Sequence, residues 1–219
     1  MANIIIVPGL AVRSFVVPAA RRLARSGHRV ELLPAPAWRG VPDDLAEYGR
    51  WLADEVLASA DPVDLMIGLS VGTQAAAVAA ARSDVRRLLL VSPTVEPSRR
   101  SRGRLLGSWL RGDDHPDSPS LRQQAPDWAR AGARRIYRGM MSAIGLRLED
   151  VLDGVSAELT MTHSGWDNLT SYDFAAALAA DHGGRILELP EAPHSWPIGD
   201  EERFVTLVDA LLAGDGPDD

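Results

Sequence analysis

The sequence predicts an α/β fold in one domain: a mostly parallel sheet of about six strands flanked by helices, with a helical segment inserted between two strands. Three observations predict it. Short apolar runs rich in Val, Ile and Leu alternate with stretches of helical periodicity. The chain has 219 residues, a length that one layered core can hold. The alternation stops over residues 92–157, where arginine clusters and amphipathic pieces replace the strand pattern.

Strands and helices alternate through the first part of the chain. The opening apolar run stops at Pro8-Gly9, which is typical of a buried strand that ends in a turn. A helical pattern follows over residues 14–26, and a second helix can be capped by Asp43 or Asp44. Strands that are joined by helices need crossover connections and therefore lie parallel. The expected strands of this part are 3–7, 28–33, 63–69 and 86–91.

The strand pattern resumes after the interruption. Residues 158–162 and 185–189 supply two more strands, and helices are expected over 171–181 and 201–213. The interruption contains amphipathic pieces, such as residues 128–144, that favour helical structure. We therefore divide the chain into a core of residues 1–91 and 158–219 and a helical lid of residues 92–157.

The composition limits the possible functions. Hydrophobic residues make up 46% of the chain and charged residues 24%, which excludes a disordered protein. Cysteine is absent, so a thiolate nucleophile or thiolate metal site is excluded. The net charge of -7 disfavours binding to nucleic acid or to an anionic membrane. The N-terminus resembles neither a signal peptide nor a membrane anchor, so we expect a cytoplasmic protein, and the exclusive use of arginine as the basic residue fits a high-GC bacterium.

A GxSxG motif lies where a buried strand meets a helix. Gly68, Ser70 and Gly72 form it, and the expected helix begins directly behind the serine. In this nucleophile elbow the serine occupies a sharp turn that raises its hydroxyl above the sheet, and the glycines let neighbouring backbone approach closely. Ser70 is therefore the predicted nucleophile. The N–H of Val71, at the start of the helix, is the natural first donor to an oxyanion.

Two loops at one edge of the predicted sheet carry a candidate base and a candidate carboxylate. A serine hydroxyl needs a base, and the base needs a carboxylate to orient it. His194 follows the last expected strand and is the predicted base, with His163 as its one serious rival. Asp167, in the same loop as His163, is the predicted orienting carboxylate. Its alternative role is to cap the helix that begins near Ser171.

The turn after the first strand is the expected source of a second oxyanion donor. It consists of Pro8, Gly9 and Leu10, and its strand should lie beside the strand that leads to Ser70. The N–H of Leu10 is the first choice and that of Ala11 the next. The alternative is that Pro8-Gly9 merely ends the strand.

These landmarks resemble the α/β-hydrolase fold family, in particular its lidded esterases, lipases and aminopeptidases. The match covers nearly the whole chain and consists of VPGL after the first strand, GLSVG at the elbow, SGWDNLTS in the acid loop and EAPHSWP in the histidine loop. The resemblance implies an α/β-hydrolase fold that begins at the family's third strand, with Ser70, Asp167 and His194 as a catalytic triad. Serine at the elbow disfavours the dehalogenases and epoxide hydrolases of this fold, which use a carboxylate nucleophile.

The predicted function is a serine hydrolase that cleaves an ester, thioester or amide of a small to medium acyl substrate through an acyl-enzyme. This chemistry needs no metal and no organic cofactor. A transferase or cyclase with the same triad is an alternative, because a lid that excludes water lets another nucleophile capture the acyl group. A binding protein without catalysis is a third possibility on this fold.

Two features of the sequence bear on the substrate. Trp38, Trp166 and Trp196 are candidates to line an apolar pocket near the triad, although tryptophans more often pack in a core. Residues 92–157 hold eleven arginines against eight acidic residues. Such an excess favours an anionic or carrier-bound substrate if the arginines face it, and is otherwise a solvated helix face. The oligomeric state has no signal in the sequence.

Overall fold

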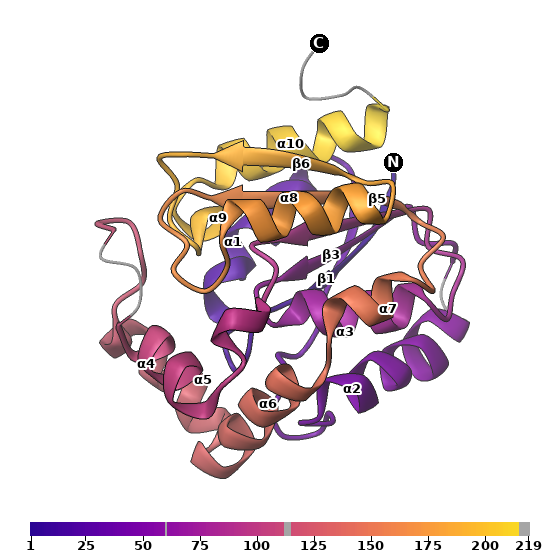
Figure 1. The fold of residues 1–219 in the computed structure, drawn as a ribbon. Helices are drawn as coiled ribbons and strands as arrows, with labels where there is room; N and C mark the ends of the chain where they lie inside the picture. The colour runs from indigo at the N-terminus through magenta and orange to yellow at the C-terminus, as the bar shows by residue number, and fades with distance from the viewer. Residues whose placement is uncertain (60, 112–114, 215–219) are drawn as a thin grey trace.

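A single parallel sheet forms the centre of the protein (Figure 1). The computed structural model describes residues 1–59, 61–111 and 115–214, so the end of the expected core segment and three residues of the expected lid lie outside the described residues. The six strands have the spatial order β2-β1-β3-β4-β5-β6, and every neighbouring pair is parallel. Their bounds are β1 Asn3–Val7, β2 Arg29–Leu32, β3 Leu65–Leu69, β4 Arg87–Val91, β5 Glu158–Ser164 and β6 Arg185–Leu189.

The six expected strands are confirmed, with ends that shift by no more than two residues. Strand residues alternate between two apolar layers, as the pleat requires. Ile4 and Ile6 of β1 pack in one layer, whereas Ile5 and Val7 pack in the other. Both faces of the central strands are therefore buried, which explains why β1, β3 and β4 are continuous apolar runs, whereas the edge strand β2 alternates between exposed and half-buried residues.

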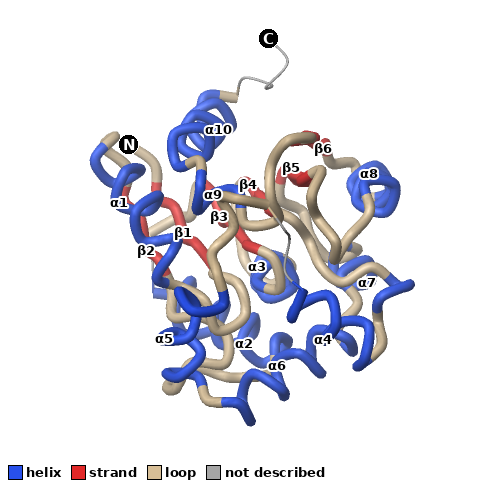
Figure 2. The backbone as a smooth tube through the Cα atoms, turned by 90° about the vertical axis from the view of Figure 1, so that its left-hand side faces the viewer, coloured by secondary structure: helices blue, strands red, loops and turns tan. Residues whose placement is uncertain are grey.

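Helices cover both faces of this sheet (Figures 1 and 2). Side chains of α1 and α10 fill one apolar layer, and those of α2, α3, α7 and α8 fill the other. Helix α2 continues into a π-helical turn at Leu52–Val56. The bounds are α1 Val17–Arg25, α2 Leu45–Trp51, α3 Gly72–Ala80, α7 Leu148–Leu152, α8 Tyr172–Asp181, α9 Trp196–Gly199 and α10 Glu201–Ala213.

Side-chain caps begin three of these helices. Asp44, rather than Asp43, caps α2 by accepting a hydrogen bond from the N–H of Glu47. Ser171 caps α8, and Asp200 caps α10. Because these polar side chains satisfy backbone N–H groups that have no partner inside the helix, the ends of the helices are fixed by local sequence.

The segment between β4 and β5 is helical throughout its described residues that have regular structure. It contains α4 Arg102–Arg111, α5 Leu121–Ala131 and α6 Ala133–Gly145 before α7. In both views α4, α5 and α6 gather at one end of the protein, away from α10 (Figures 1 and 2). The amphipathic residues 128–144 belong to two helices, because Gly132 has a φ of 82° and separates α5 from α6.

The last helix of this segment belongs to the core in its packing. Leu148 and Leu152 of α7 are buried in the same apolar layer as α3. The segment 92–157 is thus tied to the sheet at its C-terminal end. Among the described residues, no helix is both long enough and apolar enough to cross a bilayer.

Candidate active site

Ser70 occupies a strained turn between β3 and α3. Its φ is 53°, in the left-handed region that residues other than glycine seldom adopt. The turn is held on both sides, because the N–H of Ser70 donates to the carbonyl of Val91 at 2.9 Å and the N–H of Thr73 donates to the carbonyl of Ser70 at 3.0 Å. A strained residue that its surroundings hold in place is a common feature of functional sites.

The two glycines of the motif allow close packing around this turn. A Cβ atom at Gly68 would lie 2.7 Å from the Cα of Thr73, and one at Gly72 would lie 2.3 Å from the carbonyl oxygen of Pro8. Neither space admits a side chain. The motif therefore has glycine at both places because the helix and the first turn of the chain press against the elbow.

Strand register brings the other expected loops to the same edge of the sheet. Val7 pairs with Gly68, so the turn after β1 lies beside the elbow. Ser164 at the end of β5 pairs with Leu189 at the end of β6. Since all strands are parallel, the segments that follow these residues leave the sheet at its carboxyl edge, which is where α/β sheets bind their ligands.

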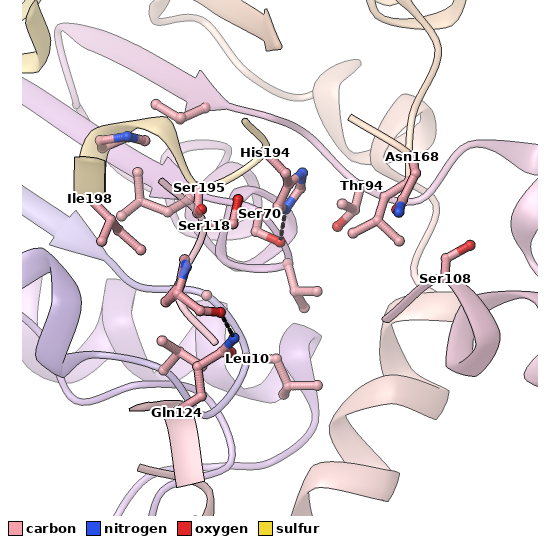
Figure 3. A pocket seen from close by; sticks show the side chains of 18 of the residues that line it. Leu10, Ser70, Thr94, Ser108, Ser118, Gln124, Asn168, His194, Ser195 and Ile198 are labelled. Atoms are coloured by element: carbon pink, nitrogen blue, oxygen red, sulfur yellow. Dashed lines mark hydrogen bonds between the residues drawn. The ribbon is translucent and has the colours of Figure 1, made fainter. Parts of the chain in front are cut away.

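One chain of hydrogen bonds joins the three side chains that the sequence singled out. The Oγ of Ser70 lies 2.8 Å from Nε2 of His194 (Figure 3). Nδ1 of His194 lies 2.8 Å from Oδ2 of Asp167. An ionised carboxylate only accepts hydrogen bonds, so Nδ1 carries a proton and donates a hydrogen bond to Asp167. Nε2 is then the acceptor for the Ser70 hydroxyl. This is the arrangement in which an imidazole can remove a proton from a serine.

The carboxylate of Asp167 is enclosed and fully engaged. Its side chain has 0% exposure, and its Oδ1 accepts hydrogen bonds from the N–H groups of Leu169 at 2.7 Å and Thr170 at 3.2 Å. These donors hold Oδ2 towards His194. The helix cap near Asp167 is instead Ser171, which leaves the carboxylate for the imidazole.

His163 lies away from this chain of hydrogen bonds. It is only 5% exposed, and its Nε2 donates to the carbonyl of Thr170 at 3.1 Å. Its ring also meets the ring of Tyr172 edge-on, with centroids 5.7 Å apart. His163, the alternative base, therefore contacts the segment that follows Asp167 and does not take part in the hydrogen bonds of Ser70.

The two N–H groups expected as oxyanion donors belong to Leu10 and Val71, which line the same cavity as Ser70. Gly9 approaches Ser70 closely, because a Cβ at Gly9 would lie 3.6 Å from the Cβ of Ser70. The N–H groups of Leu10 and Val71 form no hydrogen bond with any other residue that the structure describes. Ala11, the second choice, donates its N–H to the carbonyl of Pro36 at 2.9 Å and is already engaged.

A cavity of about 300 Å³ opens at Ser70 and His194 (Figure 3). Its walls come from the loop after β1, the elbow, the loops after β4, β5 and β6, and the segment 92–157. The residues of the segment 92–157 that line the cavity had no signal in the sequence, because scattered small polar and apolar residues form no motif. The residues that the segment contributes are Thr94, Leu105, Ser108, Ser118, Pro119, Ser120, Leu121, Gln124, Met140 and Ala143.

The expected tryptophan lining is not what the structure shows, since none of the three tryptophans lines this cavity. Trp196 is 1% exposed and packs edge-on against Phe204 in the apolar layer of α1 and α10. Trp166 is 47% exposed, and the guanidinium of Arg130 lies 5.4 Å from the ring of Trp38. Trp166 and Trp196 lie close in sequence to Asp167 and His194, but their rings do not line the cavity.

The described arginines of residues 92–157 also lie outside the cavity lining. Arg100 pairs with Glu149 at 2.5 Å, and Arg135 and Arg138 flank the carboxylate of Asp43 at 3.5 and 3.4 Å. These three side chains join the segment to itself or to the core, so part of the positive charge has a structural use.

Comparisons with known proteins identify the fold. The sequence matches no protein-family model, and no curated protein matches it. By structure, a putative alpha/beta hydrolase family protein from Desulfitobacterium hafniense matches with a TM-score of 0.69 at 15% identity, covering 96% of each chain. The hydrolase olei00960 from Oleispira antarctica matches with a TM-score of 0.76 at 13% identity, covering 98% of this chain and 92% of that one.

An esterase from Exiguobacterium antarcticum is also similar, with a TM-score of 0.71 at 16% identity, covering 97% of this chain and 92% of that one. The sheet order and these matches show that the protein has the α/β-hydrolase fold. Identities this low show the fold alone, so the activity must be argued from the site.

Proposed function

We propose that the protein is a serine hydrolase that cleaves an ester, thioester or amide through an acyl-enzyme, with Ser70 as nucleophile, His194 as general base and acid, and Asp167 as orienting carboxylate. The single observation that supports this proposal most strongly is the continuous pair of 2.8 Å hydrogen bonds from Ser70 through His194 to Asp167. Structural neighbours named as esterases and hydrolases agree with it.

The first half of the reaction follows from these contacts. The Oγ of Ser70 attacks the substrate carbonyl carbon while Nε2 of His194 takes the hydroxyl proton. The carbonyl oxygen becomes an oxyanion, which the N–H groups of Leu10 and Val71 bind. The N-terminus of α3 adds its partial positive charge at the same place. Asp167 stabilises the imidazolium through Nδ1–H.

The second half returns the enzyme to its starting state. His194 gives its proton to the leaving alcohol, thiol or amine as the carbon–heteroatom bond breaks, which leaves an acyl group on Ser70. Water then attacks the carbonyl carbon of this acyl group while His194 takes a proton from the water. The bond to Ser70 breaks, His194 returns the proton to the Oγ of Ser70, and the acid leaves. Every proton in the cycle passes through Nε2 of one imidazole.

The proposal is tested by replacing the nucleophile. Ser70→Ala should lower kcat on an ester library by about 10⁴-fold or more, because attack and acyl-enzyme formation are both lost. Ser83→Ala, just beyond the other end of α3, is a matched serine control that should keep wild-type activity. A fluorophosphonate should label the wild type and Ser83→Ala, but not Ser70→Ala.

Full esterase activity in Ser70→Ala, or a wild type that no fluorophosphonate labels, would contradict the proposal. Transfer to a second nucleophile would use the same three side chains. Product analysis with and without a competing alcohol separates hydrolysis from transfer, because only a transferase diverts most of the acyl group to the alcohol when water is in excess.

A further inference from the structure

The cavity at Ser70 has a largely apolar lining that uncharged polar side chains interrupt. Besides His194, none of the described residues that line it carries a charged side chain. Its polar members are hydroxyls and amides of the segment 92–157 and of the loops after β5 and β6. The polar lining residues are Thr94, Ser108, Ser118, Ser120, Gln124, Asn168 and Ser195.

Thr94 is the least exposed of the described residues that line the cavity with a buried hydroxyl without a partner. It is 1% exposed, it lines the cavity, and its Oγ1 is buried without a hydrogen bond to any described residue. Leaving a buried hydroxyl unpaired costs about 1–3 kcal/mol. Such a group is unusual in a folded protein, and in a binding cavity it has an obvious use as a contact for a ligand.

Ser108, on α4, presents a second buried hydroxyl to the same cavity. It is 2% exposed, and Nη1 of Arg99 lies 3.5 Å from its Oγ. Arg99 only donates hydrogen bonds, so it engages a lone pair of Ser108 and leaves the hydroxyl proton available. Figure 3 shows Thr94 and Ser108 on one side of the Ser70–His194 pair, with Ser118 and Gln124 on the other.

The charge of Arg99 interacts with Glu96, a carboxylate that does not line the cavity. Burial acts to raise the pKa of Glu96, but hydrogen bonds from Ser98 and Ser171 and the positive charge of Arg99 outweigh it and lower that pKa. Glu96 is therefore ionised beside Arg99 at neutral pH. A substrate carboxylate in the cavity would lose its hydration and meet hydroxyls rather than a lining cation, which is unfavourable.

We propose that Thr94 and Ser108 form a specificity subsite that holds an uncharged oxygen function, such as a ketone or amide carbonyl, in the part of the substrate that does not react. This inference rests on the proposed function, because it places the reacting carbonyl at Ser70. Such a subsite favours a substrate whose acyl or alkyl group carries a neutral oxygen function over one with a plain hydrocarbon chain and over one with a carboxylate.

Fluorophosphonate probes of matched shape test the subsite without requiring turnover. The probes carry a heptyl chain, an oxoheptyl chain with the ketone at carbon 4, 5 or 6, or a carboxyhexyl chain, and mass spectrometry measures the second-order rate of labelling at Ser70. One oxoheptyl probe should label the wild type about 10-fold faster than the heptyl probe, since one satisfied hydrogen bond changes the rate by about this factor. The carboxyhexyl probe should be slower than the heptyl probe.

Threonine variants identify the residue that discriminates. Thr94→Val keeps the shape and removes the hydroxyl, so the rate ratio of oxoheptyl to heptyl probe should fall at least 5-fold, whereas Thr94→Ser should restore it. Thr206→Val, on the exposed surface of α10, is a matched control that should keep the wild-type ratio. Ser108→Ala should lower the ratio as well, by a smaller factor.

Each outcome separates the subsite from the chemistry. Equal rates for heptyl and all oxoheptyl probes, or a ratio that Thr94→Val leaves intact, would overturn the subsite while the nucleophile assignment stands. A carboxyhexyl probe as fast as the heptyl probe would overturn the preference for a neutral group. If no probe labels Ser70, the proposed function itself fails.

Discussion

The sheet edge and the segment 92–157 enclose the same cavity but are held in place by different forces. At the sheet edge, the groups proposed to react stand on the loops that follow parallel strands, and backbone hydrogen bonds and register fix them. The segment packs apolar side chains of α6 and α7 against the core, and polar side chains that reach into neighbouring loops attach it further. Asp127 of α5, for example, accepts hydrogen bonds from the N–H groups of Arg13 and Ser14 at 2.9 and 2.8 Å and from the Ser14 hydroxyl at 2.6 Å.

Other contacts of the segment repeat this pattern. Nε of Arg135 on α6 donates to the carbonyl of Ala37 at 2.9 Å, and Nε2 of Gln74 on α3 donates to the carbonyl of Ala143 at 2.9 Å. Such bonds depend on one side chain each, whereas the strands share their bonds among many residues. This difference indicates that the proposed chemistry and the proposed specificity can change separately. The groups proposed to react are fixed by the sheet, whereas the groups proposed to select the substrate lie on a segment that single substitutions can shift.

Two buried aspartates, one from each region, give the largest expected contrast. Asp167→Asn should lower kcat by about 10³–10⁴-fold. Both oxygens of Asp167 accept hydrogen bonds, from His194 on one side and from Leu169 and Thr170 on the other, so an amide must turn its NH₂ towards a donor. Ester hydrolysis by purified protein measures the effect.

Asp127→Asn is the matched control for that substitution. Asp127 has a hydroxyl, Ser14, as one of its partners, and this hydroxyl can accept from the new amide while the remaining oxygen keeps both N–H bonds. Its kcat should stay within about threefold of wild type. Comparable losses in the two variants would remove the distinction between the regions.

Glycine substitutions test the packing of the same two regions. Gly72→Ala should lower the free energy of unfolding by about 3 kcal/mol, because the new Cβ would meet backbone oxygens of Pro8 and Val7 at 2.3 and 2.7 Å. Gly103→Ala, in α4, meets no other atom within 4 Å and should raise stability by about 0.5 kcal/mol. Urea unfolding measures both, and a stable Gly72→Ala would show that the elbow tolerates more movement than its contacts indicate.

The regions also differ in how far the sequence predicts them. All six strands and the residues Ser70, Asp167 and His194 could be located in advance. Apolar runs, the GxSxG motif and the positions of loops after strands are local signals in the sequence, and a parallel sheet brings the loops that follow its strands to one edge. The contact of Asp127 with Ser14 joins residues 113 positions apart, and it has no such signal.

The errors have physical causes too. The division of residues 128–144 between α5 and α6 could not be predicted, because the apolar periodicity continues through Gly132 and only the backbone shows the break there. The tryptophans failed as pocket residues because large apolar side chains serve a core as well as a cavity, and Trp196 turns towards Phe204. Thr94 and Ser108 were missed because a buried hydroxyl and a solvated one look the same in a sequence.

Removing the side chain of Asp127 should have a moderate effect on stability. Asp127→Ala leaves two N–H groups and one hydroxyl without their acceptor in a site where the aspartate is 2% exposed, so the free energy of unfolding should fall by about 2–3 kcal/mol. These N–H groups belong to residues a few positions after Leu10. A shift of this part of the chain should move Leu10 as well and lower kcat. Thermal unfolding and ester hydrolysis measure the two effects, and a loss of stability below about 0.5 kcal/mol would show that Asp127 does not anchor α5.

The smallest expected effect concerns the ion pair that joins the two ends of the segment. Both oxygens of Glu149 on α7 accept from Arg100 in the loop after β4, at 2.6 and 2.5 Å. Burial acts to raise the pKa of Glu149, but the hydrogen bonds and charge of Arg100, with a contribution from Arg147, lower it from 4.5 to about 2. A carboxyl whose pKa is lower in the folded state stabilises the fold above its unfolded pKa and loses this contribution as the pH falls towards the folded value.

The pair should therefore stabilise the protein by about 1 kcal/mol at neutral pH, and this amount should decline between pH 4.5 and pH 2. Glu149→Gln cannot ionise, so the difference in Tm between it and the wild type should be constant above about pH 5 and shrink below it. Asp54→Asn, which removes the exposed partner of Arg82 at 3.8 Å, is the surface control and should change Tm little at any pH. A Tm difference for Glu149→Gln that does not change with pH would mean that the carboxyl contributes by shape and neutral hydrogen bonding, and that the ends of the segment are joined without help from charge.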